Sequence, residues 1–320
     1  MSIDVLSDVL RAVHLTGAVY FDFELSSPWV VEAPASADIV GKIMPGAQRI
    51  MEYHLLAHGT CWANAIGQEP IRMSEGDLIG FPQGDPHVLA SAPGMRAKVD
   101  LERFASQMPL PTFVEMGGGG PERARIVCCF LGCDERPFNP LLASLPTVVY
   151  LPSGSTDPRA GWLATLLSSA ASESRGGRAG GENVRARLSE LMFVETIRLH
   201  LETLPPEQTG WLAGLRDPVV GHALAALHGQ PREGWTVERL AHVVGASRSV
   251  LAERFTAMVG QPPMQYLALW RMQLASRLLV DGGQVAEVAS EVGYESEAAF
   301  SRAFKKLVGE PPAAWKRRSG

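Results

Sequence analysis

Several side chains in the first half of the chain could bind a metal ion. Glu52 and His54 are two residues apart, so in a β-strand both side chains point to the same side. A third nitrogen ligand could come from His87, and a thiol could come from a cluster at Cys128, Cys129 and Cys133. Such donors suit Zn²⁺ or another borderline divalent metal. Two alternatives stay open: each histidine could be a hydrogen-bonded core residue, and the cysteines could form a redox switch.

Basic side chains near the end of the chain could contact a polyanion. The chain has 320 residues and a net charge of −5. Residues 217–320 carry a net charge of +2, whereas residues 1–216 carry −7. Within residues 298–320 there are six lysines and arginines and one acid, Glu310. A local basic patch on an acidic protein favours contact with nucleic acid, although basic tails are often only solvated.

The elements that must position these residues differ between the two halves. Residues 1–150 contain short apolar runs separated by Gly and Pro, which predicts a β-sandwich or β-barrel after a short helix at 4–14. Apolar residues then recur at steps of three and four from Val184 to Leu199, which predicts a helix of about 20 residues that ends at Pro205. This helix could pack on the β domain, or it could form the interface of a homodimer.

The last hundred residues contain an internal repeat. Residues 240–263 and 288–312 share a pattern in which Gly245, Phe255, Gly260 and Pro263 correspond to Gly293, Phe304, Gly309 and Pro312. Each copy predicts a helix, a glycine turn and a second helix capped by a serine, Ser247 or Ser296. This is the layout of a helix-turn-helix, and the helical pattern at 264–280 predicts a helix that joins the two copies.

In a helix-turn-helix, the second helix enters the major groove of DNA. Leu251, Phe255, Phe300 and Phe304 are predicted to face the core. Outward positions that could read base edges are Ser249, Ala252, Glu253, Glu297, Ala298, Ser301 and Arg302. Arginine can bind guanine through two hydrogen bonds, so Arg302 is the strongest candidate. The predicted phosphate contacts are Arg248, Arg254, Lys305 and Lys306.

Residues 217–320 resemble the DNA-binding domain of the AraC/XylS family of bacterial transcription regulators. The resemblance rests on Leu240-Ala241, Ser247, Leu251, Phe255, Gly260, Pro263, Tyr266, Arg271, Ala275, Leu278-Leu279, Val288-Ala289, Val292-Gly293-Tyr294, Phe300, Phe304, Gly309 and Pro312. At the usual Tyr-Arg near the end, this chain has Trp315-Lys316. The family implies two tandem helix-turn-helix units that read successive major-groove segments of an operator. Because the first recognition helix has few long polar side chains, readout could depend more on the second unit and on DNA shape.

Residues 1–200 resemble the cupin-like sensor domain of a subset of these regulators. Gly76, Pro82, Gly84 and His87 match the spacing of the second cupin motif, whereas the first motif lacks its His-x-His pair. The resemblance also covers Pro28-Trp29, Tyr53-His54, Cys61-Trp62, Val127-Cys128 and residues 139–146. Inside such a barrel, the predicted effector pocket is lined by Trp29, Glu52, His54, Trp62, Phe81 and His87, and it could hold an organic effector instead of a metal. The resemblance also implies that Cys128 is the thiol that joins His54 and His87 at a metal.

The sequence therefore predicts an α+β protein, with an N-terminal cupin-like β-barrel, helices, and an all-α C-terminal domain. The expected divisions are a sensor and dimerisation domain at 1–204, a linker at 205–216 and a DNA-binding domain at 217–320. We expect a cytoplasmic homodimer that binds operator DNA, contacts RNA polymerase if it activates, and responds to a small molecule or metal. With no long apolar run and no signal peptide, no membrane partner is expected. A cupin enzyme is the rival hypothesis, but the missing His-x-His pair and the tandem repeat argue against it.

Overall fold

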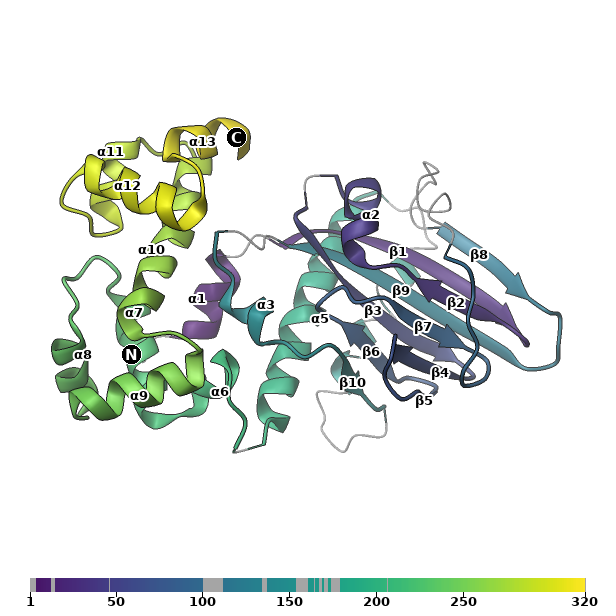
Figure 1. Ribbon diagram of the computed structural model, residues 1–320. Coiled ribbons are helices and arrows are strands. Elements are labelled where there is room, and N and C mark those ends of the chain that lie inside the picture. Colours follow the sequence, from purple (N-terminus) through teal and green to yellow (C-terminus); the bar gives the residue numbers. More distant parts are fainter. Residues whose placement is uncertain are drawn as a thin grey trace. The chain divides into compact units, whose positions relative to one another are not determined.

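The computed structural model describes residues 4–12, 15–45, 47–99, 112–133, 137–153, 161–163, 165–166, 169, 172–173, 179–205 and 207–319. The chain forms two compact units, shown in Figure 1. The helical unit consists of Met1–His14, Glu135–Ser144 and Leu204–Gly320. The sheet unit consists of Leu15–Asp134 and Leu145–Thr203. Two short stretches that precede residue 205 thus belong to the same compact unit as the predicted DNA-binding domain.

The sheet unit contains two β-sheets. Its elements are β1 (Leu15–Ser26), β2 (Val30–Ala33), α2 (Ser36–Ile43), β3 (Arg49–His58), β4 (Thr60–Ala65), β5 (Ile71–Ser74), β6 (Leu78–Phe81), β7 (His87–Ala90), β8 (Thr112–Gly117), β9 (Arg123–Cys133), β10 (Val149–Leu151) and α5 (Gly181–Thr203). The strand order is β10-β6-β3-β9-β1-β8 in one sheet and β2-β7-β4-β5 in the other. Among the strand pairs of the described residues, only β1–β8 is parallel.

The two sheets share one core. Alternate residues of each strand point inward, so Phe23 of β1 and Phe130 of β9 meet Ala63 of β4 and Leu89 of β7 in a single apolar cluster. The mixed α and β architecture predicted from the sequence is confirmed. The predicted barrel is a sandwich of two sheets within the described residues, because each sheet ends in edge strands that do not pair with the other sheet.

Helix α5 packs on the sandwich with one face and leaves apolar side chains on another. Phe193 and Ile197 are buried, and Ser189 Oγ lies 3.4 Å from Cys129 Sγ of β9. Val184 and Leu191 are 45% and 39% exposed. The predicted long helix is confirmed, and its exposed apolar side chains leave room for a partner surface. None of the described helices is long and apolar enough to cross a membrane.

The helical unit consists of helices of 5 to 18 residues. They are α1 (Val5–Ala12), α3 (Pro140–Ser144), α6 (Trp211–Arg216), α7 (Pro218–Gly229), α8 (Val237–Val244), α9 (Arg248–Val259), α10 (Pro263–Val280), α11 (Val285–Glu291), α12 (Glu297–Val308) and α13 (Pro312–Ser319). Ser247 and Ser296 accept the backbone N–H groups of Val250 and Ala299, which confirms both predicted N-caps. Gly245 ends α8 with φ 71°, a left-handed conformation that glycine adopts without strain.

Two helix-turn-helix units are present, α8–α9 and α11–α12, and α10 joins them. Leu251, Phe255, Phe300 and Phe304 are each 0% exposed, as predicted. The second unit packs Phe300 and Phe304 against Met272 and other residues in the C-terminal half of α10. The first unit places Phe255 against Tyr266 in the N-terminal half, with ring centroids 5.7 Å apart. One helix, α10, therefore contributes to the cores of both helix-turn-helix units.

The segment predicted as a linker, residues 205–216, contains a helix. Trp211, Leu212 and Ala213 of α6 are buried in the helical unit. The indole nitrogen of Trp211 donates a hydrogen bond to Tyr266 Oη at 2.8 Å. The linker was predicted because the preceding long helix ends at Pro205, whereas burial of the apolar face of α6 makes this segment part of the helical unit.

Candidate metal centre and nucleic-acid interface

Three buried side chains of the sandwich form a compact set of metal ligands. Glu52 and His54 point inward from β3, and His87 points inward from the start of β7 in the opposite sheet. His54 Nε2 lies 2.7 Å from His87 Nε2, and His87 Nε2 lies 3.6 Å from Glu52 Oε2. One ligand atom from each residue lies within 4.8 Å of the other two. The sandwich therefore brings together two imidazoles and one carboxylate from different sheets.

The carboxylate of this set is buried without a hydrogen-bond partner. Glu52 is 0% exposed, and neither of its oxygens has a hydrogen-bond partner. Burial raises the pKa of Glu52 to about 8 from its usual 4.5. Burial lowers the pKa of His87 to about 4, and burial together with the charge of His87 lowers the pKa of His54 well below 6.5. All three groups are therefore neutral at pH 7, although a buried carboxyl group usually has a hydrogen-bond partner.

A divalent cation fits this arrangement. Its positive charge would balance the negative charge of an ionised Glu52 carboxylate. The neutral imidazoles are already in the protonation state that metal ligation requires. Two histidines and one carboxylate are a donor set of zinc and of non-haem Fe²⁺ sites. His87 Nδ1 donates to the backbone carbonyl of Asp85 at 2.8 Å, which orients the ring so that Nε2 faces His54 and Glu52. Bound there, the metal would act as a Lewis acid or hold the pocket together.

Cys128 lies next to His54, at the ring nitrogen that points away from His87. It is paired with His54 across β3 and β9, and its Sγ lies 2.7 Å from His54 Nδ1. The predicted set of His54, His87 and Cys128 is therefore arranged differently: Glu52 takes the third position, and Cys128 contacts the opposite ring nitrogen of His54. In this position the thiol fixes the orientation of the imidazole. Cys129 points to the other face of β9, and none of the four cysteines forms a disulfide.

Two of the three predicted aromatic pocket residues lie in the sandwich core. Trp29 and Phe81 are buried in it, and the Phe81 ring stacks on His87 with centroids 3.8 Å apart. Trp62 is a correction to the predicted pocket. Its neighbours Cys61 and Ala63 occupy the inward positions of β4, so the strand alternation turns Trp62 to the opposite face.

The first recognition helix, α9, offers few free polar groups. Ser249 and Glu253 are exposed and Ala252 is partly exposed. Arg248, a predicted phosphate contact, forms an ion pair with Glu238 at 3.0 Å. Arg254, the other predicted phosphate contact on α9, binds Asp217, and the Asp217 carboxylate also caps the first turn of α7. Both arginines thus have partners inside the DNA-binding region.

The second recognition helix, α12, carries cations that are free to bind a polyanion. Arg302, Lys305 and Lys306 are exposed, and none has an ion pair or hydrogen bond through its side chain within the described residues. The other predicted base readers on this helix, Glu297, Ala298 and Ser301, are exposed or partly exposed. The structure thus places every predicted base reader of α12 at the surface of the second helix-turn-helix.

Comparisons with known proteins match both regions of the chain. A cupin family profile matches residues 4–202, and a helix-turn-helix domain profile matches residues 240–318. A putative AraC-like transcription regulator of Streptomyces lividans is 35% identical over 280 residues, which are 85% of this chain and 88% of the relative. The chain belongs to the AraC-like transcription regulators.

Further matches cover the whole chain or its DNA-binding part. The HTH-type transcriptional regulator AlkR of Acinetobacter baylyi is 26% identical over 99% of this chain and 100% of its own length. The crystal structure of the DNA-binding domain of AdpA in complex with a target DNA has 32% identity, covering 32% of this chain and 92% of that chain, with a TM-score of 0.31. This AraC-like regulator is thus a DNA-binding transcription factor with an N-terminal cupin domain for a ligand.

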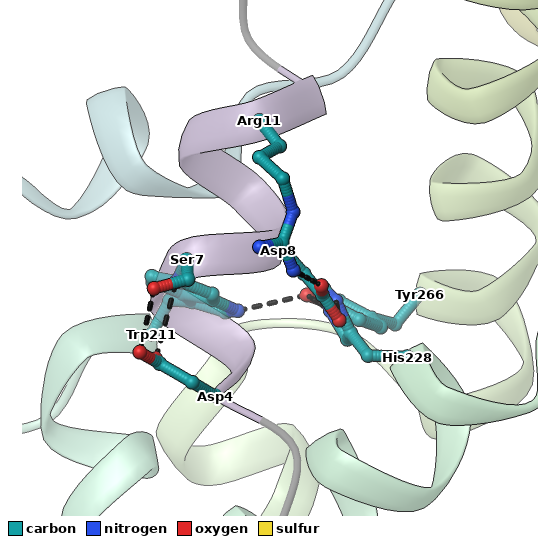
Figure 2. A network of polar contacts seen from close by, with 7 residues as sticks. All are labelled: Asp4, Ser7, Asp8, Arg11, Trp211, His228 and Tyr266. Carbon is teal, nitrogen blue, oxygen red and sulfur yellow. Dashed lines mark hydrogen bonds and ion pairs between the residues drawn. The ribbon is translucent and has the colours of Figure 1, made fainter.

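Sequence reasoning missed a buried polar network in the helical unit of this AraC-like regulator. Tyr266 Oη accepts from Trp211 Nε1 and lies 2.8 Å from His228 Nε2 (Figure 2). His228 Nδ1 faces Asp8 of α1, with Oδ2 at 3.9 Å. It also missed Gln273 of α10, which is 3% exposed. Polar residues inside an apolar helical period were the only available signal, and they do not identify a partner far away in the sequence.

Proposed function

We propose that this AraC-like regulator controls transcription in response to a divalent metal ion, Zn²⁺ or Fe²⁺, bound by Glu52, His54 and His87. The single observation that carries the proposal is the buried Glu52 carboxyl group, which has no hydrogen-bond partner and lies beside two facing imidazole nitrogens. A bound cation would remove this unfavourable burial. Metal binding would release the Glu52 proton. It would also pull β3 and β7 together, so the spacing of the two sheets would differ between the metal-bound and the metal-free protein.

The DNA contacts that we propose are unequal between the two recognition helices. On α12, Arg302 is free to bind guanine, and Lys305 and Lys306 are free to bind phosphates. On α9, Ser249, Ala252 and Glu253 can reach bases only through short or acidic side chains. Arg248 and Arg254 would have to exchange an intramolecular carboxylate for a phosphate. Sequence readout therefore comes mainly from α12, while α9 positions the regulator on the duplex.

The regulator acts as a homodimer in the cytoplasm, where its operator lies. The exposed apolar residues Val184 and Leu191 of α5, seven positions apart on one helical face, support an interface along this helix. The proposed functional divisions are a sensor and dimerisation region at 1–204 and a DNA-binding region at 217–320. If it activates transcription, RNA polymerase is its further partner.

The experiment is a measurement of metal content by plasma mass spectrometry on protein purified without a histidine tag. We expect close to one zinc or iron per chain for the parent and a loss of metal in the double variant His54→Ala/His87→Ala. The matched control is His58→Ala, because His58 is exposed on the same strand and pairs with Glu75. A β-bulge between Leu56 and His58 turns it away from the site.

Binding of a DNA duplex selected from a random pool is then measured with and without the metal. The proposal requires the affinity to change with metal for the parent and for His58→Ala, and not for the double variant. A parent that contains no metal and takes up neither Zn²⁺ nor Fe²⁺ would refute the metal centre. A metal-loaded parent whose DNA affinity ignores the metal would refute its regulatory role.

A further inference from the structure

Linker helix α10 carries one buried glutamine at the point where it passes from one helix-turn-helix core to the other. Gln273 follows Tyr266 and Trp270, which pack in the first core, and directly follows Met272, which packs in the second. Both ends of its amide group are hydrogen-bonded to other segments of the chain. Nε2 donates to the backbone carbonyl of Ala12 at 2.9 Å, and Oε1 accepts from the backbone N–H of Phe138 at 3.0 Å. One side chain thus binds two segments that are more than a hundred residues apart in the sequence.

Helix α1 docks on the helical unit along a whole face. Val5, Val9 and Ala12 are buried at 5%, 0% and 6% exposure. Asp4 caps the helix by accepting the backbone N–H of Ser7 at 3.1 Å (Figure 2). The docked helix presents a hydrogen-bond acceptor, the Ala12 carbonyl, to Gln273.

A buried polar network lies beside the docked α1. Trp211 can only donate to Tyr266 Oη, so the Tyr266 hydroxyl proton is directed to His228 Nε2. His228 then carries its proton on Nδ1, which faces the Asp8 carboxylate at 3.9 Å (Figure 2). Burial lowers the pKa of His228 to about 3, so the imidazole is neutral, and its Nδ1 has no hydrogen-bond partner within the described residues. The network thus joins α6, α7 and α10, and Asp8 of α1 lies next to it.

The second segment docks beside the first. The Phe138 ring packs edge-on against Tyr266 with centroids 5.5 Å apart. Leu141 and Leu142 of α3 are 1% and 2% exposed, and Asn139 Oδ1 accepts the backbone N–H of Leu142 at the start of this helix. The segment 137–144 is therefore held by packing as well as by Gln273.

Both docked segments are continuous with two paired strands of the sheet unit. Leu15, three residues after Ala12, begins β1, and Cys133, five residues before Phe138, ends β9. Leu15 and Cys133 are partners in the β1–β9 ladder. Strand β9 also carries Cys128, whose thiol lies against His54 of the candidate metal centre. A shift of β9 at His54 thus has a short covalent route to the residues that bind Gln273.

We propose that α1 and residues 137–144 form a clamp on linker helix α10, that Gln273 is its receiving residue, and that the β1–β9 strand pair operates it. A closed clamp fixes α10 at the junction of the two helix-turn-helix units and so fixes the spacing of α9 and α12. When the clamp is released, the distance between α9 and α12 can vary. The clamp stands on the contacts above, whereas its link to the ligand rests on the proposed metal function.

The test uses the full chain and the variant Gln273→Leu, which keeps the size of the side chain and removes both hydrogen bonds. Loss of one buried partner leaves a backbone group unsatisfied, so we expect hydrogen exchange at least about tenfold faster in residues 5–12 and 138–144, a factor that corresponds to about 1.4 kcal/mol. Gln265→Leu is the matched control, because Gln265 lies exposed on the same helix. Exchange in residues 297–308 should stay slow, which shows that the fold is kept.

The second readout is the ratio of DNA affinities with and without added zinc. We expect Gln273→Leu to bring this ratio close to one while its zinc stoichiometry stays at the parental value. Unchanged exchange at 5–12 and 138–144 would overturn the clamp. Faster exchange with a parental ratio would overturn its role in coupling. A parent that binds neither Zn²⁺ nor Fe²⁺ would refute the metal proposal alone, because the exchange readout does not depend on a metal.

A second variant covers the case in which Gln273→Leu does not fold. Phe138→Ala removes the partly buried ring that packs on Tyr266 and leaves both hydrogen bonds of Gln273 available. We expect faster exchange in 138–144 and a smaller change in 5–12. Parental exchange in both segments would overturn the clamp in this case too.

Discussion

Replacement of Glu52 by glutamine tests the metal centre through the stability of the protein. In the folded, metal-free protein burial raises the pKa of Glu52 to about 8. Between pH 4.5 and about 8, the folded state therefore holds a proton that the unfolded state has released. Because the folded state binds more protons, the free energy of unfolding falls as the pH rises through this window. Glutamine is neutral and of the same shape, so Glu52→Gln removes this fall.

The magnitude follows from the size of the pKa shift. A pH of 7 is 2.5 units above 4.5, the usual pKa of the carboxyl group in the unfolded state. Each unit corresponds to about 1.36 kcal/mol. Metal-free Glu52→Gln is therefore expected to be more stable than the parent by about 3 kcal/mol at pH 7, and by much less at pH 5. For domains of about 150–250 residues, 1 kcal/mol corresponds to about 2–4 °C, so the thermal midpoint rises by about 6–12 °C.

A bound metal should make the parent more stable to unfolding than Glu52→Gln. Free zinc at about 1,000 times its dissociation constant stabilises the parent by about 4.1 kcal/mol, which exceeds the advantage of about 3 kcal/mol that the variant has without metal. The variant lacks the carboxylate ligand and gains far less.

Thermal unfolding is followed by intrinsic fluorescence at pH 5, 7 and 8, with a chelator and then with zinc. Glu69→Gln is the control, because it makes the same substitution at an exposed residue between β4 and β5. Equal zinc-induced shifts for the parent and Glu52→Gln would refute Glu52 as a ligand. Equal metal-free midpoints at pH 7 and 8 would refute its protonation in the folded state.

Four other substitutions test the remaining roles. Arg302→Ala should lower operator affinity by about 1–3 kcal/mol and relax the preference at one base pair, measured by competition among operator variants; uniform loss at all sequences would contradict base reading. Lys305→Ala should weaken all sequences alike and reduce the salt slope of binding by about one, so a parental slope would remove it from the phosphate contacts. Cys128→Ser should keep metal stoichiometry but weaken zinc affinity about 10–100-fold in a competition titration, and complete loss of metal would instead make Cys128 a direct ligand. Leu191→Glu should shift a dimer to a monomer in sedimentation velocity, whereas an unchanged dimer would place the interface away from this face of α5.

Much of the helical unit could be predicted from the sequence because its signals are local. Helix caps, glycine turns and the 3.6-residue apolar period act within a few residues of each other, so Ser247, Ser296, Phe255 and Phe304 were placed correctly. The duplicated pattern then identified two helix-turn-helix units. The basic residues of α12 were predicted outward for the same reason, since the buried positions of a helix define its exposed ones.

The candidate metal centre was predicted only in part. The two-residue spacing of Glu52 and His54 placed both on one side of a strand, and this was correct. Which thiol or carboxylate completes the set depends on strand register, which no local pattern specifies. The pairing of His54 with Cys128 puts the thiol at Nδ1 rather than at the shared Nε2 side, and strand alternation at Cys61 turns Trp62 outward.

The sequence by itself determined the class of protein, the two helix-turn-helix units and the residue types at the metal centre, because composition, periodicity and motif spacing are properties of short stretches of chain. Only the tertiary structure decided that Glu52, His54 and His87 meet between two sheets. It alone also showed that α1 and α3 belong to the helical unit and that Gln273 binds both Ala12 and Phe138. These contacts join residues far apart in the chain, and they form because buried polar groups must find partners wherever the packed core brings them together.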